Sequence, residues 1–151
     1  MGNETVKNGF RQGSGRGNIP YHNDINSPIT FSFSAAAGAA NVADVTITAV
    51  DGSGATVAGV FSPLVFLSDA ATGAGLTSTT ASGTVTAKSA SGADLGAITA
   101  KKALFLQSLA TGIAILEITD TAKTGFYVCA VNPFTGETHV SSQLVTASYG
   151  A

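Results

Sequence analysis

Short segments in which apolar and polar residues alternate, separated by turn signals, restrict the fold of this chain more than any other feature. Ile29-Thr30-Phe31-Ser32-Phe33-Ser34 alternates strictly, and the stretch from Val42 to Val50 places Val45, Ile47 and Ala49 on one face. A period of two residues is typical of a strand with one buried face. Turn signals at intervals of about 8–12 residues indicate an all-β sandwich or barrel. Further strands are predicted at residues 56–61, 64–68, 84–89, 103–109, 113–119, 126–131 and 139–148.

The connecting segments are rich in residues that favour turns. Asp51-Gly52-Ser53-Gly54 predicts a tight hairpin turn. The segment Ala35-Ala36-Ala37-Gly38-Ala39-Ala40 is compatible with one helical turn or with a close-packed linker, and the sequence leaves both open. Lys101-Lys102 interrupts an apolar region. We interpret this pair as a charged edge that prevents sheets of different molecules from pairing.

The composition favours packed sheets and argues against two classes of partner. Charged residues make up 11% of the 151 residues, against about 25% in an average soluble domain. A chain with so few charged residues suits sheets that pack on each other, or surfaces that contact other subunits. The net charge is −2, and no basic stripe could follow a phosphate backbone, so we expect no nucleic acid partner. No apolar run approaches the ~20 residues that span a bilayer, so we expect no membrane partner.

The chain changes character near residue 35, which predicts two parts: an extended N-terminal arm over residues 1–34 and a β-sandwich domain over 35–151. Gly13-Ser14-Gly15-Arg16-Gly17 cannot hold a helix, because each glycine adds backbone freedom that folding must remove. The arm is either a tail without fixed structure or a segment that orders on another subunit. The second reading is favoured by large apolar residues at irregular spacing, namely Val6, Phe10, Ile19, Tyr21 and Ile25.

The segment from Ile118 to Val131 resembles a corner of an immunoglobulin-like sandwich. In that fold a tyrosine near the start of the penultimate strand, two residues before a cysteine, hydrogen-bonds back across the corner. Tyr127 stands two residues before Cys129, Asp120 is placed to cap the turn, and Gly125 could supply a positive φ. The alternative is that Phe126 faces inward and Tyr127 has no such role. Cys129 is the only cysteine, so we expect a buried thiol without a disulfide.

Residues with catalytic or metal-binding chemistry are sparse. The two histidines are His22, in the arm, and His139, which we expect on a solvated surface beside Glu137. A metal site needs three or four converging ligands. Asp69 and Asp94 fall singly at turns, as structural turn aspartates do. The sequence therefore predicts no enzyme, no catalytic residues, no metal site and no cofactor.

Three stretches resemble small virion proteins of tailed bacteriophages, the head decoration (cement) proteins and head-fibre proteins. They are residues 41–47 (NVADVTI), 65–76 (VFLSDAATGAGL) and 118–128 (ITDTAKTGFYV). The resemblance covers about residues 40–148. It implies an immunoglobulin-like or related β-domain with an arm on the capsid, and no chemistry. It also implies binding to the major capsid protein on the outer capsid surface after synthesis in the host cytoplasm, and a homo-oligomer such as a trimer.

Physical reasoning then selects the expected contact residues. Large aromatic side chains carry most interface energy, so Phe10, Tyr21, Phe31 and Phe33 are predicted to bind the partner. Arg11 and Arg16 would pair with acidic capsid positions. Residues 29–34 are expected to add a strand to a neighbouring subunit, since main-chain hydrogen bonds give affinity without special side chains.

Two other functions stay open. The sandwich could be a tail or fibre module that contacts the host surface, which would differ in copy number per particle. It could also be a carbohydrate-binding adhesive module, for which aromatic platforms are expected. The chain has three tyrosines and no tryptophan.

Overall fold

The computed structural model describes residues 29–151, which form nine β-strands and one short 3-10 helix. Nearly all of the regular structure is therefore strand, as the sequence predicts. The elements are β1 (Thr30–Ala37), β2 (Val42–Val50), β3 (Leu64–Ser68), β4 (Val85–Ala87), β5 (Ala93–Thr99), β6 (Ala103–Gln107), β7 (Ile113–Thr119), β8 (Tyr127–Val131), β9 (Thr138–Val140) and the helix η1 (Thr146–Ser148).

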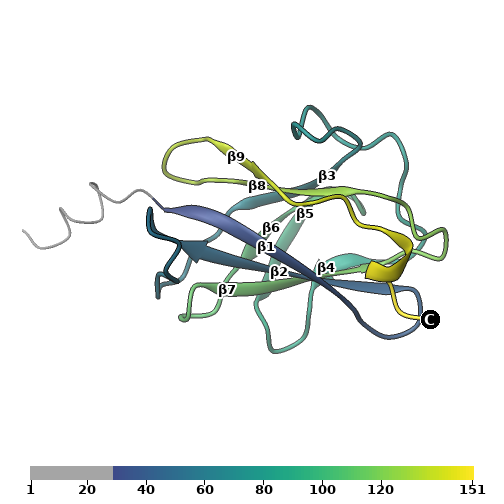
Figure 1. Cartoon of the computed structure of the whole chain (residues 1–151), viewed down its shortest axis with the longest axis horizontal. Helices are drawn as coiled ribbons and strands as arrows, with labels where there is room; N and C mark the ends of the chain where they lie inside the picture. Colours follow the sequence, from purple (N-terminus) through teal and green to yellow (C-terminus); the bar gives the residue numbers. More distant parts are fainter. Residues whose placement is uncertain (1–28) are drawn as a thin grey trace, which may run out of the picture.

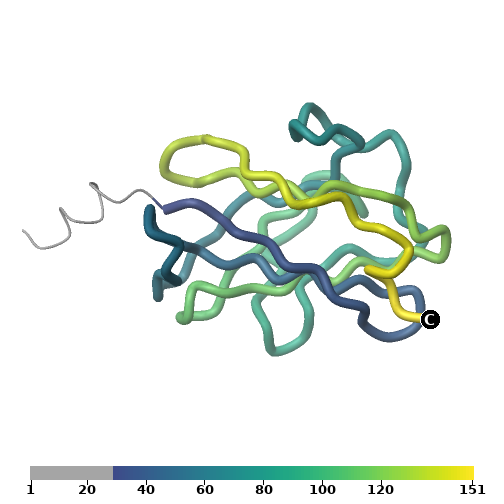
Figure 2. The backbone as a smooth tube through the Cα atoms, viewed as in Figure 1, coloured from purple at the N-terminus to yellow at the C-terminus, as the bar shows by residue number. Residues whose placement is uncertain are grey.

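The strands form two antiparallel sheets that face each other (Figure 1). The four-stranded sheet has the order β1-β2-β7-β4, and the five-stranded sheet has the order β5-β6-β3-β8-β9. The tube in Figure 2 shows the chain passing from one layer to the other through loops at both ends. The prediction of an all-β sandwich is confirmed.

The arrangement corresponds to an immunoglobulin-like sandwich with one departure. In chain order and position, β1, β2, β7 and β4 match the A, B, E and D strands of one immunoglobulin sheet, and β3, β8 and β9 match C, F and G of the other. The β5–β6 hairpin lies between D and E in the sequence and extends the second sheet beside β3. This hairpin widens the outer face of the five-stranded sheet.

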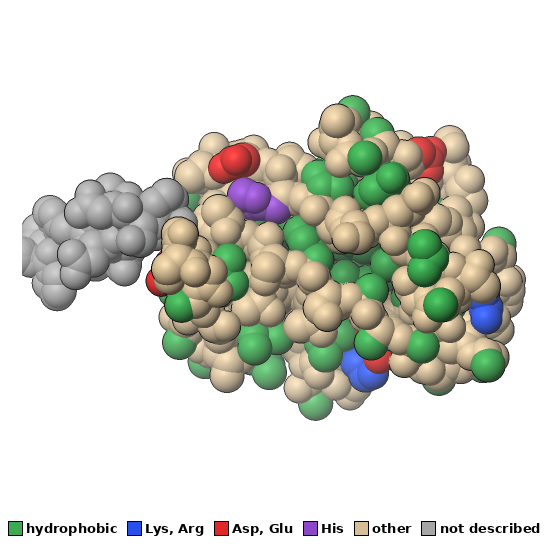
Figure 3. All heavy atoms as spheres, viewed as in Figure 1, with side chains coloured by type: hydrophobic (Ala, Val, Ile, Leu, Met, Phe, Trp, Pro, Cys, Tyr) green, Lys and Arg blue, Asp and Glu red, His purple; other side chains and the backbone are tan. Residues whose placement is uncertain are grey.

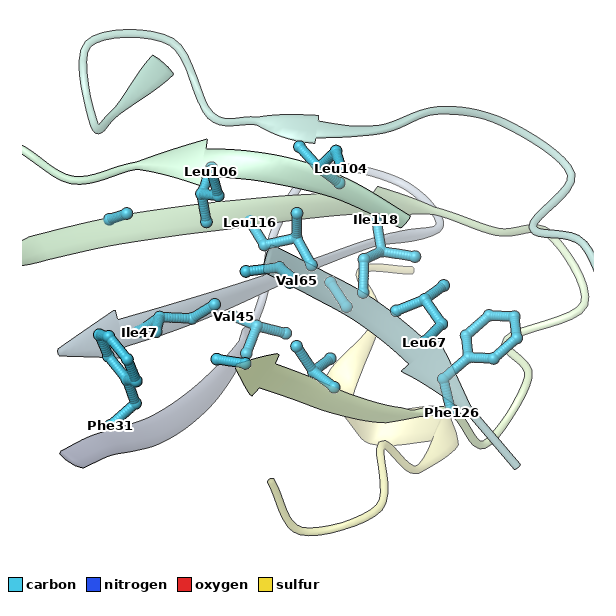
Figure 4. Close-up of a cluster of buried hydrophobic side chains, with 14 of the residues drawn as sticks. Phe31, Val45, Ile47, Val65, Leu67, Leu104, Leu106, Leu116, Ile118 and Phe126 are labelled. Atoms are coloured by element: carbon cyan, nitrogen blue, oxygen red, sulfur yellow. The ribbon is translucent and has the colours of Figure 1, made fainter. Parts of the chain in front are cut away.

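The core lies between the two sheets and consists largely of alternate residues of β2, β3, β6, β7 and β8 (Figure 4). Val45 and Ile47 of β2 and Leu116 and Ile118 of β7 point into the core from one sheet. Val65 and Leu67 of β3 point into it from the other sheet. Full burial of an aliphatic side chain stabilises a fold by roughly 1.5–3 kcal/mol. No tryptophan contributes, so aliphatic side chains with Phe126 and Phe31 fill the interior.

The N-terminal boundary predicted at residue 34 falls within a strand. β1 pairs with β2 over its whole length, from Thr30 opposite Val50 to Ala37 opposite Ala43. Residues 29–34 therefore do not belong to an arm that is separate from the sandwich. They form part of the sandwich, because β2 satisfies one edge of the strand and the core takes its apolar face. The sequence left open whether residues 35–40 form a helical turn or a linker. In the structure Ala35–Ala37 continue the strand β1.

Three further expectations are corrected. Residues 56–61 contribute only isolated bridges at Thr56 and Gly59 instead of a strand. The strand expected over 139–148 ends at Val140 and is followed by η1. Lys101 and Lys102 occupy the turn between β5 and β6, with φ of 62° at Lys101, and do not form a strand edge. By contrast, β5 was not expected from the sequence.

The corner between β7 and β8 forms without Tyr127. Tyr127 lies opposite Ser68 and points to the outer face, because Phe126 and Val128 on either side of it are buried in the core. The hydroxyl that serves this corner belongs to Tyr149, which donates a hydrogen bond of 2.7 Å to the Thr124 carbonyl oxygen. The prediction for Tyr127 is therefore wrong, and the alternative with Phe126 inward is correct.

Asp120 caps the same corner as expected. Its side chain is buried and accepts hydrogen bonds from the Thr124 backbone N–H at 2.9 Å and the Ser82 backbone N–H at 3.0 Å. Burial alone would raise the pKa of Asp120, but the hydrogen bonds from Thr124 and Ser82 outweigh it and the pKa is lowered. The positive φ expected at Gly125 occurs at Lys123 instead, at 51°.

Candidate interaction surface

Three loops and the start of β1 meet at one end of the sandwich, which we call the N-terminal end. These are the β2–β3 loop (residues 51–63), the β6–β7 loop (108–112) and the β8–β9 loop (132–137). They lie together at the end where the described chain begins, opposite the end that carries the C-terminus (Figure 1). The N-terminal end is therefore where residues 1–28 join the sandwich.

Asn132 organises the β8–β9 loop and ties it to the start of the described chain. Its side chain is buried, and its Oδ1 accepts a hydrogen bond of 2.9 Å from the Phe134 backbone N–H. Its Nδ2 donates a hydrogen bond to the carbonyl oxygen of Ile29. Sequence reasoning missed Asn132, because an asparagine after a strand is an ordinary turn residue.

Ser108 joins the other two loops of the N-terminal end. Its buried Oγ accepts a hydrogen bond of 2.9 Å from the Phe61 backbone N–H, and its hydroxyl lies 3.2 Å from the Gly59 carbonyl oxygen. The Gly59 backbone N–H in turn donates to the Ala110 carbonyl oxygen at 2.8 Å. The β2–β3 loop is thus held against the β6–β7 loop by these three hydrogen bonds, of which the one from Phe61 to Ser108 is buried, and this favours a fixed surface.

Large apolar side chains are exposed on this fixed end. Phe134 is 71% exposed, Val60 57% and Leu109 42%. Phe134 contacts Phe61 edge-to-face, with ring centroids 6.3 Å apart, so its ring is oriented although it is open to solvent. Scattered exposed apolar residues are normal, but three at one end on hydrogen-bonded loops form a candidate contact surface. We call Val60, Leu109 and Phe134 the apolar end cluster.

The outer face of the five-stranded sheet continues this apolar character. Phe105 of β6 lies opposite Leu64 of β3, and Leu64 lies opposite Val131 of β8. Phe105 is 42% exposed. The strands β3, β6, β8 and β9 contain no Asp, Glu, Lys or Arg. On the face that Figure 3 shows, charged side chains are likewise few and separate from one another.

The loop that follows β3 covers part of that outer face. A Cβ atom at Gly73 would lie 3.0 Å from Val140 Cγ2 and 3.2 Å from Cys129 Sγ, so the loop backbone rests directly on β8 and β9. This loop buries Cys129 completely, outside the core between the sheets. Burial raises the pKa of the Cys129 thiol to about 11. The expectation of a buried free thiol is confirmed.

Two side chains hold this loop in place. Asp69 accepts hydrogen bonds from the Ser78 backbone N–H at 2.8 Å and the Ser78 Oγ at 2.9 Å, which lower the pKa of Asp69. Lys102 Nζ donates to the carbonyl oxygens of Thr77 at 2.8 Å and Ser78 at 3.1 Å. The lysine pair that we interpreted as a protective edge therefore serves, through Lys102, to fasten the loop.

The six predicted partner-binding residues do not come together as expected. Phe10, Arg11, Arg16 and Tyr21 lie outside the described residues. Phe31 is 8% exposed and belongs to the core of its own chain, and Phe33 is partly buried against the same core. Phe31 and Phe33 therefore lie in the sandwich and not on a free arm, and their role in binding a partner stays a prediction. Both point inward because β1 pairs with β2 and turns its odd-numbered residues toward the opposite sheet.

The described residues show no arrangement of metal ligands. Within residues 29–151, no group of three or more His, Cys, Asp or Glu side chains gathers as a metal ion would require. His139 is not on a solvated surface as expected, because its ring packs edge-on against Phe31 with centroids 6.1 Å apart. Its Nε2 lies 4.0 Å from Glu137 Oε1. The described part of the chain also has no helix long and apolar enough to cross a bilayer.

Comparisons with protein-family models, with curated proteins and with solved structures find no match to this chain. The resemblance to phage head proteins therefore stays a prediction from the three stretches of sequence given above.

Proposed function

We propose that this protein is a structural component of a tailed-phage virion that binds the outer surface of the capsid and stabilises its lattice. The observation that carries this proposal is the apolar end cluster, at the end of the sandwich where residues 1–28 join. In this proposal, Phe10 and Tyr21, which precede Ile29 in the sequence, bind the same partner as the cluster. Aromatic and aliphatic groups of this kind supply most of the affinity in protein interfaces.

The chemistry of this surface favours a protein partner. The apolar end cluster carries no charge, and the strands of the adjoining sheet face that surround Phe105 and Leu64 also lack charged side chains. A contact of this type depends on apolar burial rather than on steering by charge. A capsid lattice presents the same contact many times, so that a modest contact area per copy is sufficient for retention.

Two valines provide a matched test of the proposed contact. Val60 and Val145 are each 57% exposed, but Val60 belongs to the apolar end cluster and Val145 lies at the opposite end beside η1. Binding of full-length protein to undecorated capsids would be measured by co-sedimentation. We expect Val60→Ser and Phe134→Ser to weaken binding at least tenfold, and Val145→Ser to bind like the wild type. Equal binding by all variants would exclude the apolar end cluster as the contact.

A further inference from the structure

The four edge strands of the sandwich differ in how they are protected against pairing with another chain. β4 and β9 have three residues each, and Lys88 follows β4 directly. β5 pairs with β6 through two register shifts and carries Asp94. Short strands, charges and irregular pairing are the devices that natural proteins use to block an edge. Three of the four edges therefore carry such a device.

β1 is the exception. It has eight residues in continuous register with β2, and its sequence TFSFSAAA contains no charged residue and no proline. Among the described residues it pairs with β2 alone, and no backbone hydrogen bond joins its second edge to another described segment, although β9 and η1 lie near β1. In Figure 1 β1 crosses the front of the molecule and is not covered by another strand. A long, regular and uncharged edge is a template for strand pairing.

We propose that β1 pairs antiparallel with β1 of a second copy of this chain, about a two-fold axis that passes through Ser34. This contact joins the four-stranded sheets of the two copies into one continuous sheet. The inference concerns the oligomeric contact and does not depend on the proposed function.

The sequence of β1 is self-complementary in this register. Residues directly opposite each other in an antiparallel pair point to the same face. An axis through Ser34 places Phe31 opposite Ala37 of the second copy and Phe33 opposite Ala35 of the second copy. On the other face, Ser32 lies opposite Ala36 of the second copy, and Ser34 meets its own counterpart. Each large side chain thus faces a small one, and no pair brings like charges together.

Exposure along β1 agrees with this pairing. Phe31 is buried and Phe33 half-buried, whereas Ala35 and Ala37, which share their face, are exposed. The two alanines therefore leave room on the inward face at the C-terminal half of the strand. Phe33 of the second copy would cover Ala35 there. A strand from a capsid subunit is the other candidate for this edge, and it would leave the protein monomeric in solution.

Cysteine substitution tests the pairing and its register. In the full-length protein, Ser34→Cys places two thiols directly opposite across the axis, at the separation that a disulfide spans. Ser32→Cys is the matched control, since Ser32 is exposed on the same face but would lie about 13 Å, or four residues, from its counterpart. The native Cys129 does not interfere, because it is buried.

We expect wild-type protein to sediment at equilibrium with a mass near twice 14.9 kDa. Ser34→Cys should form a disulfide-linked dimer at least ten times faster than Ser32→Cys under mild oxidation. Ser34→Lys should raise the dissociation constant of the dimer at least tenfold, with an unchanged circular dichroism spectrum. A monomeric wild type at every concentration, or equal cross-linking of the two cysteine variants, would overturn the proposal.

Discussion

Tyr149 offers the sharpest test of how the corner between β7 and β8 is stabilised. Its side chain is 3% exposed, and its hydroxyl donates a hydrogen bond of 2.7 Å to the Thr124 carbonyl oxygen. Tyr149→Phe keeps the ring in the core and removes only this donor. The Thr124 carbonyl oxygen keeps a second donor, the Phe126 backbone N–H at 2.9 Å, so the substitution leaves no unpaired acceptor. We therefore expect the loss of one net hydrogen bond, about 0.5–1.5 kcal/mol.

The assay is unfolding in urea, followed by circular dichroism, for wild type, Tyr149→Phe and Tyr127→Phe. The midpoint should fall for Tyr149→Phe at unchanged slope, and the melting temperature should fall by roughly 2–5 °C. Tyr127→Phe is the matched control, because Tyr127 points to the outer face, and its free energy of unfolding should change by less than about 0.5 kcal/mol. Equal effects of the two substitutions would refute the assignment of the corner to Tyr149.

The same residue predicts a dependence on alkaline pH. Burial, together with the nearby Asp120 carboxylate, raises the pKa of Tyr149 above its ordinary value. The folded state therefore holds the phenolic proton of Tyr149 more tightly than the unfolded chain does. The stability that this difference contributes is complete below about pH 10 and is lost as the pH rises above that value. Tyr149→Phe should remove that part of the alkaline loss of stability. An unchanged alkaline profile in the variant would contradict the assignment.

Three other predictions concern the loop, the thiol and the N-terminal boundary. Lys102→Met removes the donor to Thr77 and Ser78, so proteinase K should cut within residues 70–83 several times faster, and an unchanged rate would show that Lys102 does not hold the loop. With a pKa of about 11 and no exposure, Cys129 should react with a disulfide reagent at pH 8 only after unfolding; fast reaction of native protein would contradict its burial. Removal of residues 1–28 should leave the free energy of unfolding within about 0.5 kcal/mol of the full-length value. Removal of residues 1–34 also deletes Phe31 and Phe33 from the core and should lower that free energy by at least about 3 kcal/mol. Equal urea midpoints for the two truncated proteins would contradict the placement of β1.

The strands that alternate regularly could be predicted from the sequence. Residues 30–34, β2 and β7 each bury every second residue in one core, so their period of two is visible without a structure. β5 could not be predicted, because its two register shifts break the alternation and leave most of it exposed. The alternation of residues 29–34 also does not reveal whether they pair with a strand of their own chain or with a strand of another chain. An edge strand has the same sequence pattern in both cases.

Side-chain roles at the corner and at the N-terminal end required the three-dimensional arrangement. The spacing of Tyr127 and Cys129 fits the immunoglobulin pattern, but the register with β3 turns both to the outer face. Tyr149, which serves the corner, lies far along the chain from Thr124, so no local motif connects them. Ser108 takes its partners from a distant loop, and Asn132 joins its own loop to Ile29 at the start of the described chain. The apolar end cluster likewise combines three separate loops.

We propose that this chain is a component of a phage head, and the number of copies per virion is the measurement that decides between this proposal and its alternatives. If a phage genome encodes this chain, its virions would be purified and analysed by quantitative mass spectrometry, with the major capsid protein as the internal reference. We predict a copy number that stands in a fixed ratio to the copy number of the major capsid protein and is close to it, as for a protein that covers a lattice. A few copies per particle would indicate a tail or fibre part, and absence from the particle would contradict a structural role in the virion.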